Sequence, residues 1–197
     1  ARTVLSRVLL DLGEFDQAQV LATTLYEETK AKSGSDHPST LTALTDLAGI
    51  KEKKGFFDEA EKELNEALSG YRKVFGEKHP TTITVLNNLG QMMESEGLYD
   101  NAEPLLRQAV MLSEQVFGKS HPTTLTAQNN LALLHESQGN FDKAEPLYQQ
   151  AIDTLSQILG PRHSDTVAII NNLAYLYLLK EEYAKALPLF EKILGLW

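Results

Sequence analysis

Apolar residues recur along the chain in a single frame of 42 residues. The frame aligns a leucine column, an alanine column and an aromatic column: Leu5, Leu47, Leu89, Leu131, Leu173; Ala18, Ala60, Ala102, Ala144, Ala186; Phe15, Phe57, Tyr99, Phe141, Tyr183. Within one unit, Leu86, Leu89, Met92 and Met93 follow the spacing that is typical of one face of a helix. The pattern predicts repeated units, each built from two amphipathic helices.

The residues between the apolar stretches predict where these helices begin and end. First helices are expected to start after four histidines, three of which precede a proline: His37-Pro38, His79-Pro80, His121-Pro122 and His163-Ser164. They are expected to end at glycines in one column, where the last unit has Glu181: Gly13, Gly55, Gly97 and Gly139. Second helices are expected to run for about 18 residues, to open with capping boxes and to hold a proline in the first turn: Asp58, Asp100, Asp142; Pro104, Pro146, Pro188.

Each helix pair has more apolar surface than it can bury alone, so neighbouring pairs are expected to stack. We predict an all-α fold, a right-handed superhelical solenoid of antiparallel helix pairs that forms a single array over residues 1–197. Its units are approximately 1–36 (partial), 37–78, 79–120, 121–162 and 163–197 (partial). Ala1 falls inside a first helix, and Leu194, Leu196 and Trp197 do not resemble a polar cap. We therefore expect a fragment of a longer protein with exposed apolar ends.

Composition narrows the classes of function. The formal charge is −9, no cysteine is present, and no apolar run approaches the roughly 20 residues of a membrane span. Acidity spread over all units, without a basic stripe, disfavours nucleic-acid and membrane partners. The lack of cysteine fits a reducing compartment, so cytoplasm is the default expectation.

Candidate catalytic and metal-binding groups do not converge in this pattern. His37, His79, His121 and His163 occur once per unit and are expected to cap helices, while His135 is expected to lie in packing or on the surface. Glu52, Glu94 and Glu136 form a ladder with steps of roughly 10 Å, too long for a shared metal or a catalytic pair. No phosphate loop or nucleophile motif is present. We expect no catalytic residue, no metal and no cofactor, and hence no enzyme.

The unit resembles a tetratricopeptide repeat of the long, 42-residue kind found in kinesin light chains and in many bacterial and fungal multidomain proteins. The residues that carry the resemblance are Asn129-Asn130-Leu131-Ala132, Gly139-Asn140-Phe141-Asp142-Lys143-Ala144-Glu145-Pro146-Leu147-Tyr148 and the turn from Leu159-Gly160 to His163. The resemblance implies that first helices line a concave face on which peptides or partner helices lie. It implies that an asparagine before the leucine column bonds the main chain of the ligand, a role that falls on Asn88, Asn130 and Asn172.

Helical spacing adds neighbours to this face: Asn87, Asn129, Asn171, Gln91, Glu94, Glu136 and Tyr175. The stripe is acidic to neutral in the middle and apolar near Tyr175 and Leu179, and Asp46 adds a further acid. Kinesin light chains, by resemblance, bind acidic tryptophan-containing motifs in a basic groove, which this stripe does not suit. We expect a scaffold for a neutral or basic protein or peptide with an apolar anchor. The alternatives are self-association through the exposed ends, or a regulatory array attached to an ATPase or peptidase domain.

Overall fold

The computed structural model describes residues 2–195, without the side chains of residues 2, 3, 7 and 11. Over this range the chain forms ten helices and no strand. The helices are α1 (Arg2–Asp11), α2 (Phe15–Ser33), α3 (Pro38–Lys53), α4 (Phe57–Phe75), α5 (Pro80–Ser95), α6 (Tyr99–Phe117), α7 (Pro122–Ser137), α8 (Phe141–Ile158), α9 (Ser164–Leu179) and α10 (Tyr183–Leu194). The predicted all-α class and the two helices per 42-residue repeat are confirmed. Leu196 and Trp197 lie outside the described residues.

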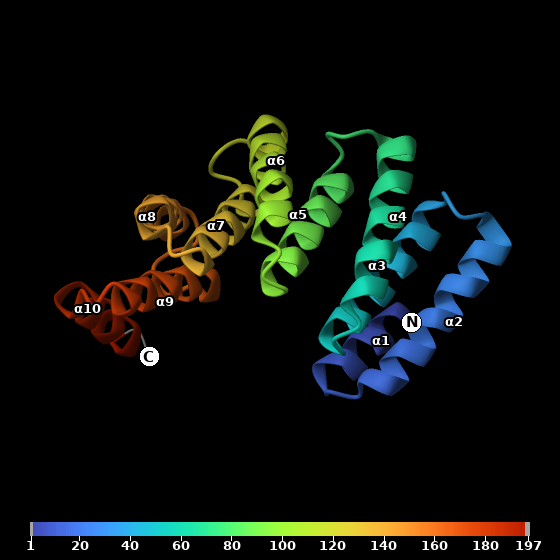
Figure 1. Cartoon of the computed structure of the whole chain (residues 1–197), viewed down its shortest axis with the longest axis horizontal. Helices are drawn as coiled ribbons and strands as arrows, with labels where there is room; N and C mark the ends of the chain where they lie inside the picture. Colours follow the sequence, from blue (N-terminus) through green and yellow to red (C-terminus); the bar gives the residue numbers. More distant parts are fainter. Residues whose placement is uncertain (1, 196–197) are drawn as a thin grey trace. The chain divides into compact units, whose positions relative to one another are not determined.

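The chain divides into two compact units, unit 1 (Ala1–Glu96) and unit 2 (Gly97–Trp197). Within each unit, consecutive helices pack against one another and are joined by short turns, so that neighbours run antiparallel (Figure 1). The single array over residues 1–197 stays a prediction. Among residues 2–195, no helix has both the length and the apolar character needed to cross a membrane.

The histidines of the repeat cap the first helices, as predicted. In each case Nδ1 accepts the backbone N–H two residues further on, which satisfies one of the donors that a helix start leaves unpaired. The capping residues of α3, α5, α7 and α9 are His37, His79, His121 and His163. Two rings also stack on the aromatic residue that ends the preceding helix, Phe75 on His79 at 4.3 Å and Phe117 on His121 at 4.6 Å between centroids.

In three repeats a threonine three residues after the histidine holds the turn before it, whereas Oγ1 of the equivalent Thr40 has no hydrogen-bond partner among the described residues. Its Oγ1 donates to the carbonyl of a glycine six residues earlier, in Thr82 to Gly76 at 2.9 Å, Thr124 to Gly118 at 2.8 Å and Thr166 to Gly160 at 2.9 Å. In these three repeats the histidine caps one helix, and the threonine fixes the turn that precedes that helix.

First helices end as predicted, and the last one ends under strain. Gly97 and Gly139 follow α5 and α7 with φ of 77° and 72°, a left-handed conformation that glycine adopts without penalty. Glu181, in the same column after α9, has φ of 59° and is the one non-glycine residue with positive φ in residues 2–195. A side chain in this conformation carries an energetic penalty.

Two predictions about the second helices are wrong. Asp58, Asp100 and Asp142 are the second helical residues, and the N-cap positions before them make no side-chain cap. The carboxylates can still interact favourably with the helix dipole. The prolines are the sixth helical residues rather than members of the first turn: Pro104, Pro146 and Pro188. They are exposed, so the carbonyl that each leaves unbonded one turn earlier can bond water.

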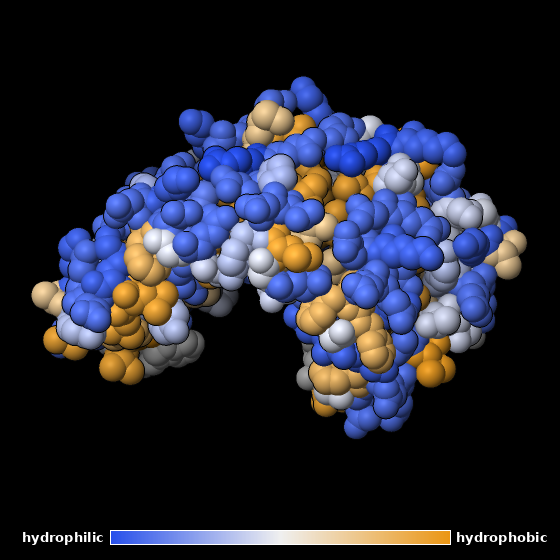
Figure 2. Space-filling model, viewed as in Figure 1, coloured by the Kyte–Doolittle hydropathy of each residue, from blue (hydrophilic) through white to orange (hydrophobic). Residues whose placement is uncertain are grey.

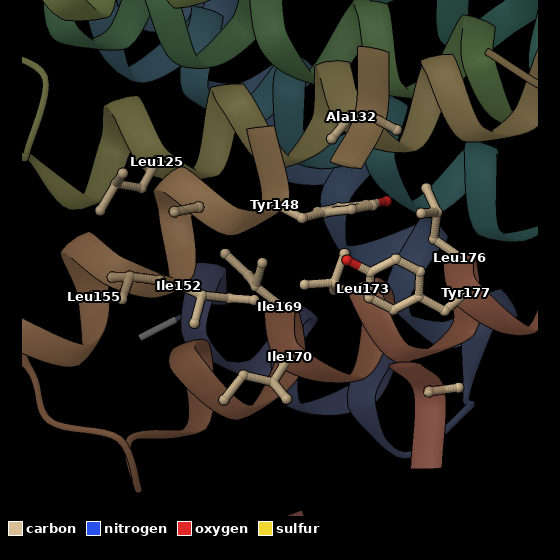
Figure 3. Close-up of a cluster of buried hydrophobic side chains, with 13 residues drawn as sticks. Leu125, Ala132, Tyr148, Ile152, Leu155, Ile169, Ile170, Leu173, Leu176 and Tyr177 are labelled. Atoms are coloured by element: carbon tan, nitrogen blue, oxygen red, sulfur yellow. The ribbon is translucent and has the colours of Figure 1, made fainter. Parts of the chain in front are cut away.

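Small residues permit the close approach of helices in each core. Ala60 and Ala102 are fully buried, as are Ala132 and Ala144. In unit 2 the core gathers around Leu125, Tyr148, Leu155, Ile169 and Leu173, which come from α7, α8 and α9 (Figure 3). This packing holds the first helices α7 and α9 beside each other. It therefore sets the spacing of the side chains on the face of these two helices that is turned away from α8, which we call the open face.

Candidate functional site

The predicted binding residues all lie on first helices. In unit 1 they come from α5, with α3 as its neighbour, and in unit 2 from α7 and α9. Each unit therefore presents its own set of polar side chains.

In unit 1, Asn88 borders a surface pocket of about 350 Å³ between α1, α3 and α5. Its lining residues are Ser6, Leu10, Thr45, Asp46, Gly49, Ile50 and Asn88. Apart from its chain neighbours and the nearby backbone of its own helix, no atom lies within 4 Å of the position that a Cβ would take on Gly49, so the absence of a side chain there leaves room in the pocket. The pocket combines a carboxylate, a carboxamide and a hydroxyl with apolar walls, which suits a polar or basic side chain with an aliphatic stem.

The other predicted residues of unit 1 differ in exposure. Asn87 is 8% exposed, and among the described residues its Oδ1 has no hydrogen-bond partner. Gln91 is exposed, and Glu94 and Asn88 are half-buried. Asn87 is therefore part of the packed surface, while Asn88, Gln91 and Glu94 remain accessible to a ligand.

In unit 2 the asparagine pairs bond to each other. Asn172 Nδ2 donates to Asn129 Oδ1 at 3.1 Å, which links α9 to α7. Asn130 is 6% exposed, whereas Asn171 is exposed. Asn129 and Asn172, which are both half-buried, thus each use one polar atom of the carboxamide in the bond between α7 and α9. The other polar atom of each side chain can bond a ligand.

The last member of the glutamate ladder is used inside the protein. Tyr148 Oη donates to Glu136 Oε2 at 3.0 Å, so α8 positions this carboxylate on α7. Glu136 is half-buried and Glu52 lies 3.5 Å from the ammonium of Lys53. The ladder is a set of acids with separate surroundings, and among residues 2–195 no three histidine or acidic side chains gather as a metal site requires.

Apolar side chains collect on the surface of α9 and α10. Tyr175 is 52% exposed and Leu179 is 43% exposed on α9, and Leu187 is 60% exposed on α10. Figure 2 shows apolar side chains gathered where Figure 1 draws these two helices. An apolar group on a partner would find its counterpart on this part of unit 2.

Burial shifts the pKa of two further groups, Glu96 and His135. Burial is the main reason that the pKa of Glu96 lies above its usual value, and the nearby carboxylates of Glu61 and Asp58 add to it. His135 is 2% exposed, so the packing alternative for this residue is confirmed, and burial lowers its pKa. Both belong to the packed framework.

Sequence reasoning missed a second pocket, in unit 2 between the N-terminal halves of α7 and α9. It is lined by Pro122, Leu125, Thr126, Asn129, Leu155, Asp165, Ala168 and Ile169. The available signal was a break in one column, because Ala168 follows Thr42, Thr84 and Thr126 at the 42-residue spacing, whereas the position of Leu155 varies and holds Tyr71 in unit 1. The sequence does not reveal that residues 155 and 168 line the same space, so it could not predict the pocket.

Comparisons with known proteins agree on one family. The model of the family described as tetratricopeptide repeat matches residues 39–115, 92–157 and 123–197, and a second model with the same description matches residues 1–22. No curated protein matches the chain.

Several solved structures share the fold. A putative kinesin light chain from Podosopora anserina with nearly identical tetratricopeptide-like repeats (Q17M) has 23% identity and a TM-score of 0.83, with 99% of this chain and 92% of that chain covered. BtubC (BKLC) from P. vanneervenii has 19% identity and a TM-score of 0.83, with 99% and 78% covered. A Rap protein complexed with Competence and Sporulation Factor has 13% identity and a TM-score of 0.82, with 99% of this chain and 52% of that chain covered.

Proposed function

Because the chain belongs to the tetratricopeptide repeat family and has repeats of the kinesin-light-chain type, we propose that it is a scaffold that binds a protein or peptide on the open faces of its first helices. The observation that carries the proposal is the set of carboxamides on these faces. Asn88 borders a pocket in unit 1, and Asn129 and Asn172 stand side by side in unit 2. A carboxamide donates and accepts, so it can match a peptide group without reading the side chain.

The chemistry of the faces supports a neutral or basic partner. In unit 1 the carboxylate of Asp46 lines the pocket, Glu94 adds a half-buried carboxylate on α5, and the exposed Gln91 is neutral. In unit 2 the exposed surfaces of Tyr175 and Leu179 suit an apolar anchor. A basic group of a partner therefore suits unit 1, and an apolar group suits unit 2.

The structure of the Rap protein complexed with Competence and Sporulation Factor supports a role in binding at the level of the fold. In this chain the role rests on the side chains named above. Binding is also the chemistry that their arrangement supports, because they are separate donors and acceptors rather than a converging catalytic group.

The test is affinity capture with the intact chain as bait, followed by identification of the captured protein and measurement of its Kd by calorimetry. Each groove hydrogen bond is worth about 0.5–1.5 kcal/mol. We therefore expect simultaneous replacement of Asn88, Asn129 and Asn172 by alanine to weaken binding about tenfold or more. The matched control replaces the exposed Asn65 and Asn101 on second helices and should leave Kd unchanged. Equal affinity of the triple variant and the wild type would remove the asparagines from the mechanism.

A second candidate function is self-association. Tyr183, Leu187 and Leu194 on α10 are 62%, 60% and 76% exposed, an amount of open apolar surface that often marks an interface. Chromatography with light scattering tests it, with the Leu187→Glu variant as comparison. A mass that rises with concentration in the wild type and stays monomeric in the variant supports self-association. A monomer at every concentration excludes it.

A further inference from the structure

The pocket between α7 and α9 of unit 2 has an apolar floor and a polar rim. Leu125, Leu155 and Ile169 form the floor and are 1%, 2% and 7% exposed (Figure 3). Asn129 and Asp165 stand at the rim, where they remain accessible. The pocket has a volume of about 160 Å³. A cavity of about 150 Å³ is enough to bind benzene, so the volume corresponds to one aromatic ring.

Unit 1 shows which group fills the equivalent place. Two repeats before Leu155 stands Tyr71, which is 2% exposed. Its hydroxyl lies 3.0 Å from Thr42 Oγ1, and Thr42 Oγ1 itself donates to the carbonyl of Pro38 at 2.9 Å. Since the only hydrogen on that oxygen is used by Pro38, the phenol of Tyr71 is the donor to Thr42.

Unit 2 repeats this arrangement without the phenol. Thr126, the equivalent of Thr42, donates to the carbonyl of Pro122 at 3.0 Å. Within the described part of the chain, this is the one hydrogen bond of the Thr126 hydroxyl, and because Thr126 is exposed and lines the pocket, its oxygen can accept a donor from a ligand there. Leu155 is shorter than tyrosine by most of a ring, and Ala168 stands where α5 has Thr84. Both changes leave space at the position that Tyr71 occupies in unit 1.

We propose that this pocket binds a tyrosine side chain of the partner, which enters from the open face of α7 and α9. The partner's ring approaches from the side opposite to α8, whereas Tyr71 belongs to α4. The ring lies flat on Leu125, Leu155 and Ile169, with its hydroxyl beside the exposed Thr126, to whose Oγ1 it donates. The carboxylate of Asp165 at the rim disfavours a phosphorylated or acidic side chain. The inference rests on the proposed function, because it names one residue of the partner that the scaffold recognises.

The pocket can be tested without the partner, with p-cresol as the probe of the tyrosine side chain. Titration followed by methyl NMR should give saturable shifts at Leu125, Leu155 and Ile169. Toluene, which lacks the hydroxyl, should bind about 2- to 10-fold more weakly. No saturable shift at these methyls, or equal binding of the two probes, would overturn the assignment of a tyrosine.

The chain supplies the variants that fill the pocket. Ala168→Thr restores the residue of the earlier repeats, and Leu155→Tyr places the chain's own phenol in the pocket, so each should abolish the p-cresol shifts. Ala184→Thr, on the exposed surface of α10, is the matched control and should keep them. Conversely, the double variant Tyr71→Leu/Thr84→Ala should create a second site in unit 1, with shifts at the methyls of Leu41 and Val85. Shifts that persist in both filled variants would contradict the proposal.

The partner captured with the scaffold gives an independent readout. Ala168→Thr should raise the Kd of the partner at least tenfold, and replacement of the anchoring tyrosine in the partner should raise the Kd by a similar factor. If Ala168→Thr leaves the affinity for the partner unchanged while the triple asparagine variant loses affinity, the tyrosine pocket is wrong, but the proposed binding by the asparagines on the open faces is supported. If the triple asparagine variant also binds the partner with wild-type affinity, the proposed binding by the asparagines on the open faces is wrong.

Discussion

Asn172 Nδ2 donates to Asn129 Oδ1 over 3.1 Å, across 43 positions of sequence and between two neighbouring first helices. The bond gives the paired asparagines different tasks. Asn172 and Asn129 join α9 to α7, while Asn171, beside Asn172 in sequence, points to solvent. Adjacent identical residues therefore differ in what they contribute to stability and what they offer a ligand.

We expect the Asn172→Ala variant to lower the free energy of unfolding by about 0.5–1.5 kcal/mol, because one partly buried hydrogen bond is lost. Asn171→Ala is the matched control and should change it by less than about 0.5 kcal/mol. Urea denaturation followed by circular dichroism measures both. Equal stability of the two variants would show that the bond does not form in solution.

The histidine caps should matter in proportion to the contacts that they make. His121→Ala removes the acceptor for the N–H of Thr123 at 3.2 Å and the stacking partner of Phe117. We expect it to lower the free energy of unfolding by about 1–2 kcal/mol. His121→Asn keeps a capping oxygen and should recover part of the loss. A loss that is the same for both variants would assign the effect to stacking alone.

The strained end of α9 should be relieved by the residue that the other repeats use. Glu181→Gly replaces a side chain at φ of 59° with a glycine, as at Gly97 and Gly139. We expect the melting temperature to rise and the free energy of unfolding to increase by about 0.5–1 kcal/mol. Glu191→Gly, within helical α10, should instead destabilise by about 1 kcal/mol. Destabilisation by Glu181→Gly would mean that the glutamate side chain contributes more than its conformation costs.

His135 should make the protein less stable in mild acid. Burial is the main cause of its lowered pKa; on the surrounding helices Glu103 favours the charged ring, whereas Arg107 and Lys143 oppose it. As pH falls below about 6.5, the ordinary histidine value, the unfolded chain takes up a proton before the folded protein does. The stability of the neutral, buried ring is thus present above that pH and decreases below it.

The equivalent residue one repeat earlier is Met93. Replacement of His135 by methionine should therefore remove the contribution of this histidine to the pH dependence of stability. The difference in unfolding free energy between pH 7.5 and pH 5.5 should be smaller in His135→Met than in the wild type. Met93→Leu in unit 1 is the control and should keep the wild-type difference. An unchanged pH dependence in His135→Met would show that other groups cause it.

Features that depend on neighbours in the chain could be predicted from the sequence. The 42-residue frame, the ten helices, the histidine caps and the glycine ends follow from spacing and local backbone preference, which act within one or two turns. The capping boxes failed because Asp58 and its equivalents lie two residues past the N-cap, inside the helix, where the side chain cannot act as a cap. The position of Pro104 was misjudged for the same reason, since the start of α6 falls at Tyr99.

By itself, then, the sequence determined the family, the helix pairs and the helices that carry the polar face. Only the tertiary structure decided which of those polar side chains are used internally, as in the bond from Tyr148 to Glu136 and in the burial of Asn130 and His135. It also decided that Leu155 and Ala168, 13 positions apart on two helices, border one open space. Helical periodicity fixes the direction of a side chain from its own axis, whereas contact between helices depends on the volumes of all the residues packed between them.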